Sequence, residues 1–224
     1  SDADAMAASY FDVDGTLVRS NLMHTAIYYM ANDINPLHSM RNIASLVMRA
    51  PRLIAAELRD RRQFNELLFE IFKGTPEDRL HMLADDTFEW AMKQHIYDGA
   101  RDIIRREKEN GHKVVLVSGA LDFLLERLSD YLGADEYMGN HLEINDGLCT
   151  GKLGRPVVAG PSKSRIIADH ARANGFDLAE CAGYSDSYSD VPMLSIVGKP
   201  AALNPDAKLR RLAIAYGWPV IDLT

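Results

Sequence analysis

The stretch Ser9-Tyr10-Phe11-Asp12-Val13-Asp14-Gly15-Thr16-Leu17-Val18 decides the fold, because it joins a short apolar run to two carboxylates one residue apart. Tyrosine, phenylalanine and valine favour a strand, and a glycine permits the sharp turn by which the chain leaves it. Open α/β sheets bind their ligands at the carboxyl ends of such strands. Two carboxylates placed there are costly unless a cation or a shared proton relieves them. A plain strand with a common Asp-Gly turn is the alternative interpretation.

The composition is that of an ordinary globular protein. The 224 residues are 47% hydrophobic and 25% charged, enough for a sizeable core. The net charge of −7 argues against nucleic acid as the main partner. The two cysteines, Cys149 and Cys181, lack the spacing of a disulfide framework or a zinc site. The sequence shows no membrane-spanning run and no signal peptide, so we expect a cytoplasmic protein, with residues 1–5 ahead of Met6 a remnant of expression.

The sequence pattern of the chain changes near residue 97. From residue 22 to 96 glycine is almost absent and apolar residues recur at helical spacing, which predicts four or five helices and no strand. From Asp98 onward helices and strands alternate, which predicts a parallel sheet with helices on both faces. We predict helices at 100–110, 121–132, 162–174 and 207–216, strands at 113–117, 180–184, 201–203 and 220–221, and a β-hairpin at 142–153.

The expected fold class is therefore α/β, a Rossmann-like parallel sheet with helices on both faces and an inserted all-helical cap domain. The first strand belongs with the alternating part, so the core would comprise residues 6–18 and 98–224, and the cap residues 19–97.

Four features fall at predicted strand ends or at the start of a helix. Taken singly, each has an ordinary explanation as a helix cap, a solvated lysine or a loop carboxylate. Taken together, the carboxylates suit a hard cation such as Mg²⁺, and the hydroxyl, amide and ammonium suit a phosphate. A carboxylate beside the cation can attack phosphorus and form an aspartyl-phosphate. The features are Asp12/Asp14, Ser118-Gly119, Lys163 and Asp186/Asp190.

These motifs resemble those of the haloacid dehalogenase (HAD) phosphohydrolase superfamily, in its phosphoserine-phosphatase-like branch (subfamily IB) with a helical cap. Residues 11–17 resemble the DxDGT signature, and residues 115–119 (Val-Leu-Val-Ser-Gly) the second motif. Lys163, 23 residues before Asp186, resembles the third motif, and residues 183–190 the acidic fourth motif. The resemblance covers essentially the whole chain from Met6.

The resemblance implies a role for each matching residue. Asp12 would be the nucleophile and a Mg²⁺ ligand, and Asp14 the general acid and base, with its backbone carbonyl on the metal. Ser118 and the Gly119 amide would hold phosphate oxygens, and Lys163 would neutralise charge on Asp12 and the phosphate. Asp186 would ligate Mg²⁺, while Thr16 would orient Asp14 and Asp190 would support the metal or Lys163.

The predicted activity is Mg²⁺-dependent hydrolysis of a small polar phosphomonoester, such as an amino-alcohol, histidinol or glycerol-type phosphate. Asp14 favours a phosphatase, since the superfamily's dehalogenases lack a carboxylate there; a β-phosphoglucomutase-like phosphotransferase is an open alternative. Asn21 and Leu68 stand where phosphoserine phosphatases carry a substrate-binding glutamate and arginine, so specificity is expected to differ. A lysophospholipid or other lipid-phosphate phosphatase, and a catalytically silent binding protein, are further alternatives.

The stretch from Arg41 to Arg62 is basic within an acidic chain. It holds six arginines interleaved with apolar residues. A helix with a solvated basic face is the favoured interpretation, and contact with an anionic membrane surface is the alternative. The oligomeric state is not readable from the sequence.

Overall fold

The computed structural model describes residues 7–19, 28 and 36–223, the side chains at 36–39, 41–42 and 57–58 excepted. No helix in this described part is long and apolar enough to cross a membrane.

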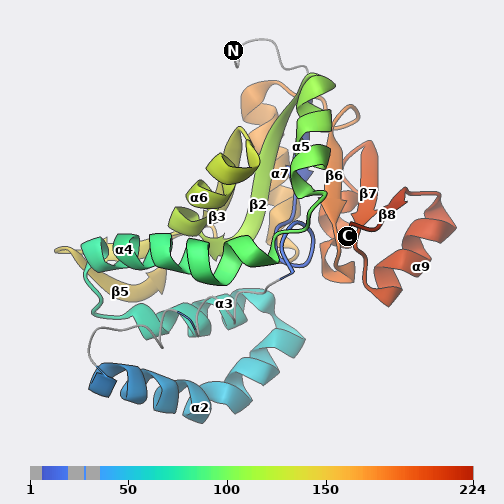
Figure 1. Ribbon diagram of the computed structural model, residues 1–224. Helices are drawn as coiled ribbons and strands as arrows, with labels where there is room; N and C mark the ends of the chain where they lie inside the picture. The colour runs from blue at the N-terminus through green and yellow to red at the C-terminus, as the bar shows by residue number, and fades with distance from the viewer. Residues whose placement is uncertain (1–6, 20–27, 29–35, 224) are drawn as a thin grey trace.

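A six-stranded sheet forms the centre of the described structure, in the order β3-β2-β1-β6-β7-β8 (Figure 1). All of its neighbouring strands run parallel, as expected from the alternation of helices and strands. A separate antiparallel hairpin is formed by β4 and β5. The strands are β1 (Ala7–Phe11), β2 (His112–Leu121), β3 (Glu136–Asn140), β4 (Leu142–Asn145), β5 (Leu148–Leu153), β6 (Ala182–Ser185), β7 (Lys199–Leu203) and β8 (Val220–Ile221).

Helices cover both faces of the sheet, which confirms the predicted fold class. Successive residues of β1 point to opposite faces. Phe11 joins an apolar cluster with α5 and α6, whereas Tyr10 joins a second cluster with α7, α8 and α9. The helices are α2 (Pro36–Arg59), α3 (Arg61–Phe69), η1 (Glu70–Phe72), α4 (Glu77–Thr87), η2 (Phe88–Met92), η3 (Lys93–His95), α5 (Ala100–Glu109), α6 (Asp122–Leu132), α7 (Ser162–Asn174), η4 (Tyr188–Asp190), α8 (Val191–Leu194) and α9 (Ala207–Tyr216).

The segment predicted to be all-helical is helical in its described part, from Pro36 to His95. Only α2 and α3 form an apolar cluster of their own, built on Leu53, Ala56, Phe64 and Leu68. The side chains of α4 and η2 belong to the main core cluster instead. The domain boundaries at 18/19 and 97/98 therefore stay a prediction, although α2 and α3 lie together at one end of the molecule (Figure 1).

Most predicted elements after Asp98 are confirmed, including the 142–153 hairpin, whose turn residues Asp146 and Gly147 both have positive φ. The strand β3 was not predicted, because Glu136, Gly139 and Asn140 interrupt the apolar pattern of this edge strand. Strand β2 is also longer than predicted. It continues past Val117, the predicted end, as far as Leu121, so Ser118 lies within the strand rather than after it.

Candidate active site

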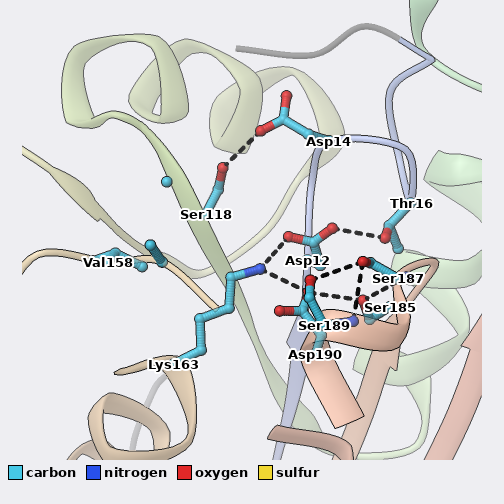
Figure 2. A network of polar contacts seen from close by, with 12 residues as sticks. Asp12, Asp14, Thr16, Ser118, Val158, Lys163, Ser185, Ser187, Ser189 and Asp190 are labelled. Carbon is cyan, nitrogen blue, oxygen red and sulfur yellow. Dashed lines mark hydrogen bonds and ion pairs between the residues drawn. The ribbon is translucent and has the colours of Figure 1, made fainter. Parts of the chain in front are cut away.

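The candidate site lies at the carboxyl edge of the sheet, around the end of β1. Strand β1 lies between β2 and β6, so residues at the ends of these three strands are brought together. Asp12 follows β1, Ser118 lies in β2, and Asp186 follows β6. Lys163 reaches the same place from the first turn of α7 (Figure 2). The strand order reverses at β1, which makes this edge the usual ligand site of an open α/β sheet.

Lys163 links two carboxylates in the interior of the site. Its Nζ donates to Asp12 Oδ1 in a short contact and to Asp190 Oδ2 at 2.9 Å. All three side chains are at most 7% exposed. Burial alone would lower the pKa of Lys163, but attraction to Asp12 and Asp190 raises it above the ordinary value. Lys163 is therefore a permanent cation beside Asp12.

One side-chain oxygen of Asp190 is held by two hydrogen bonds, whereas the other has no partner among the described residues. Ser185 Oγ donates to Asp190 Oδ2 at 2.8 Å, alongside Lys163. Oδ1 is buried and accepts no hydrogen bond from the described residues. Burial raises the pKa of Asp190, although Lys163 opposes the shift. An orphaned carboxylate oxygen in a polar site indicates that water or an ion completes it.

Thr16 bridges the carboxylates that follow β1 and β6. Its Oγ1 lies 2.9 Å from Asp12 Oδ2 and 3.0 Å from Asp186 Oδ1, and it accepts the Asp186 backbone N–H. A hydroxyl has a single proton, so both carboxylate contacts are satisfied only when one carboxyl is itself protonated. Burial and the charge of Asp12 raise the pKa of Asp186 to about 8, which makes Asp186 the protonated partner in the absence of a cation.

Gly15 makes this close approach possible. Its φ of +84° is a left-handed conformation that side chains disfavour. A Cβ atom at this position would lie 2.2 Å from Asp186 Oδ2. The glycine of the first motif is thus explained by the carboxylate of the fourth.

Asp14 lies on the other side of Asp12 from Thr16 and is partly buried (Figure 2). Ser118 Oγ donates to Asp14 Oδ2 at 3.3 Å (Figure 2). Burial and the neighbouring Asp12 raise the pKa of Asp14 to about 7. A carboxyl with this pKa can donate a proton and take one back near neutral pH.

Two asparagines that the sequence analysis did not single out hold the site in shape. Asn140, at the end of β3, donates to the carbonyls of Gly119 and Val158 and accepts the Val158 N–H. Asn204, after β7, donates to the Thr16 carbonyl at 3.0 Å in a positive-φ conformation. The Asn-Pro-Asp sequence after the predicted 201–203 strand is a turn signal that could have identified Asn204, whereas no local pattern marks Asn140.

Helix α3 contributes Arg61, its first residue. Its guanidinium lies 3.5 Å from Ser189 Oγ in the fourth-motif loop, and its charge weakly opposes the rise in the pKa of Asp14. In the sequence, Arg61 is only one of the six arginines of the basic stretch. Leu68 is fully buried in the apolar cluster that α2 and α3 share. Asn21 lies outside the described residues.

The donor set fits Mg²⁺, although within residues 7–19 and 36–223 no group of three His, Cys, Asp or Glu side chains is arranged to hold a metal ion. Mg²⁺ needs only one or two carboxylates beside water and phosphate oxygens. Asp12 and Asp186 are joined through Thr16, and the orphaned oxygen of Asp190 lies in the same site. A hard divalent cation would relieve the repulsion that raises the pKa of Asp186.

Known proteins that resemble this chain in sequence or structure indicate its family. The haloacid dehalogenase-like hydrolase family matches residues 10–195. The chain is 32% identical to the inhibition of morphological differentiation protein of Streptomyces azureus, over 96% of this chain and 78% of that protein. It is also 32% identical to phosphoserine phosphatase SerB1 of Mycobacterium tuberculosis, over 98% of this chain and 71% of the relative. A solved protein of unknown function from Bordetella pertussis Tohama I superposes with a TM-score of 0.83 at 25% identity, covering 97% of this chain and 99% of that one.

Proposed function

The chain belongs to the haloacid dehalogenase-like hydrolases and is a phosphatase of the phosphoserine-phosphatase-like branch, and on that premise we propose that it hydrolyses a small polar phosphomonoester through an aspartyl-phosphate on Asp12, with Mg²⁺ as cofactor. The observation that carries the proposal is the ion pair between Lys163 and Asp12, buried beside a carboxyl whose pKa is about 7. This arrangement supports roles for Asp12 as the nucleophile, Lys163 as a fixed cation and Asp14 as the proton donor.

In the first step, Asp12 attacks phosphorus and the bond from phosphorus to the leaving oxygen breaks. Asp14 gives its proton to that oxygen, so the product leaves as a neutral alcohol. Lys163 offsets the charge of the approaching anions, which would otherwise repel each other. Mg²⁺ held by Asp12, Asp186 and the Asp14 carbonyl would neutralise charge on the phosphate.

In the second step, water attacks the aspartyl-phosphate. Asp14, now ionised, takes a proton from the water, the bond between phosphorus and Asp12 breaks, and inorganic phosphate is released. Ser118 Oγ and the Gly119 amide would hold the phosphate oxygens through both steps. The hydrogen bonds of Asn140 to Gly119 and Val158 keep that cradle in place.

Contacts between α3 and the core support a small substrate. Asn65 of α3 is buried and donates to the Val158 carbonyl at 3.2 Å, beside Lys163. Glu66, also in α3, pairs with Arg155, which precedes α7, at 2.8 Å. These contacts bring the cap down onto the core next to the site, which limits the room for a leaving group. The fully buried Leu68 has no charge to offer a carboxylate, so phosphoserine is not the preferred substrate in this proposal.

Asp12→Asn tests the proposal, with phosphate release measured over a panel of phosphoserine, histidinol phosphate, glycerol phosphates, sugar phosphates, nucleotides and lysophosphatidate. We expect EDTA to abolish release by the unaltered protein, and Asp12→Asn to lower kcat at least about 10³-fold while remaining folded. Asp102→Asn, a change in an exposed carboxylate of α5, is the control and should keep full activity. An active Asp12→Asn protein, or no release from any ester with Mg²⁺ present, would contradict the proposal.

A further inference from the structure

The outward face of α2 carries apolar side chains that nothing in the described structure covers. Met40, Ile43, Val47, Met48 and Ile54 are between 44% and 83% exposed. Four of them recur at intervals of three, four and seven residues, which places them on one side of the helix, with Met48 at its edge. We call these five residues the α2 stripe.

The opposite side of the helix is the one that packs. Leu53 and Ala56 are buried against Phe64 and Leu68 of α3. Arg49, on the same inward side, pairs with Glu70 at 2.7 Å. The helix is thus anchored to α3 by one side, and the described residues leave its apolar stripe on the other side uncovered. Figure 1 shows α2 at the end of the molecule farthest from the sheet, with α3 between it and the core. An exposed apolar face of this kind marks an interaction surface.

Arginines border the stripe. Arg52 lies one helical turn after Met48, Arg59 lies two turns after Arg52, and both are exposed. Helix α2 carries four arginines and a single glutamate in a chain whose net charge is −7. The charge of this helix is therefore opposite to that of the protein as a whole.

We propose that α2 docks in the plane of an anionic lipid bilayer, with the α2 stripe inserted among the acyl chains and Arg52 and Arg59 on the lipid headgroups. Helices that lie in a membrane interface combine these two features, an apolar face and a basic border. Methionine side chains adapt to a fluid surface, and a convex helix face offers no groove for a shaped partner.

A second copy of the chain is the less favourable occupant. A twofold interface would set the α2 stripe against itself and bring together two helices that each carry four arginines and a single glutamate. Like charges at an interface oppose association, whereas anionic headgroups attract the same arginines. The charge pattern therefore favours the bilayer.

Vesicle flotation tests the proposal with the full chain. Vesicles of phosphatidylglycerol and phosphatidylcholine in equal parts are compared with pure phosphatidylcholine, in about 50 mM and about 0.5 M NaCl. We expect retention by the anionic vesicles at low salt alone. An arginine near an anionic surface contributes about 1 kcal/mol, which is about fivefold in affinity, so Arg52→Ala/Arg59→Ala should weaken binding about 25-fold. Val47→Glu/Met48→Glu should abolish it.

The matched control is Ile214→Glu/Tyr216→Glu in α9, where both side chains are about as exposed as those of the α2 stripe, at 68% and 72%. This variant should bind vesicles like the unaltered protein. All variants should hydrolyse a soluble phosphomonoester normally, which shows that they are folded and keeps this test separate from that of the proposed function. Absence of binding to anionic vesicles at low salt would overturn the proposal. So would binding that Val47→Glu/Met48→Glu leaves unchanged, or a dimer in sedimentation that this variant dissociates.

Discussion

Gly15→Ala separates the two reasons for a glycine in the first motif, backbone conformation and room for Asp186. At φ +84° an alanine costs about 1–2 kcal/mol. Its Cβ would also lie 2.2 Å from Asp186 Oδ2, so the carboxylate would have to move by about 1 Å or more to restore an ordinary contact. The clash falls on the end of a side chain, which can swing away, so the fold survives while the geometry of the site is lost.

Gly111→Ala is the matched control. Gly111 has φ +80°, and a Cβ atom added to it would meet nothing within 4 Å. It lies just before β2, at the opposite edge of the sheet from the site. Both variants should lose the same 1–2 kcal/mol, a fall in Tm of about 2–8 °C for a chain of this size. A displacement of about 1 Å in a catalytic group can lower the rate about 100-fold.

The assay is kcat/KM for a phosphomonoester as a function of Mg²⁺ concentration, beside Tm by circular dichroism. We expect Gly15→Ala to lose about 100-fold in kcat/KM and to need more Mg²⁺ for half-maximal activity, whereas Gly111→Ala keeps its activity. Equal activities of the two variants at equal Tm would refute the reasoning, because the contact between Gly15 and Asp186 would then have no consequence for the site.

Three further predictions concern the charges of the site. Asp14→Asn should lower kcat far more for alkyl phosphates than for p-nitrophenyl phosphate, whose good leaving group needs little protonation; equal losses would contradict the role of Asp14 as acid. The pKa of Asp186 is raised to about 8, so its contribution to stability is complete below about pH 4 and is lost as the pH rises toward 8 without a cation. Mg²⁺ binds the ionised carboxylate, so it should raise Tm more at about pH 8.5 than at about pH 6, and a reversed order would count against the site. Arg61→Ala should raise KM about tenfold with a smaller effect on kcat, because a guanidinium beside the fourth-motif loop contributes roughly 1.5 kcal/mol to binding an anion; steady-state kinetics on one alkyl phosphate measures both constants.

The candidate site was predictable where short local patterns end at strand termini. Asp12, Ser118 and Asp186 each follow or end an apolar run, and parallel strands bring such ends to one edge. The structure brings these residues together with Lys163 and Asp190, while their catalytic roles stay predictions. The apolar alternation that identifies strands was also what β3 lacked, so its existence was missed.

The remaining features depend on contacts between distant segments. Asn140 acts on Gly119 and Val158, which lie 21 and 18 residues away, and Arg61 meets a loop 128 residues later. A polar residue of this kind has no periodic signature, because its position is set by the packing of other elements. The exposed side of α2 was equally hidden, since a helical pattern does not say which of two apolar sides packs inward.

The excess of negative charge in the site helps to decide between an active enzyme and a catalytically silent binding protein. Lys163 pairs with Asp12 and Asp190, while Asp14 and Asp186 lie close enough to Asp12 to be repelled by its charge. Repulsion and burial raise the pKa of Asp14 to about 7 and of Asp186 to about 8, so the folded chain takes up protons to offset the excess charge. Buried ionic clusters are weak sources of stability, and apolar replacements of similar volume are often neutral or stabilising. Asp14 and Asp186 are not paired with Lys163, so a chain without turnover would gain stability by losing either of them, and the presence of both therefore favours a working phosphatase.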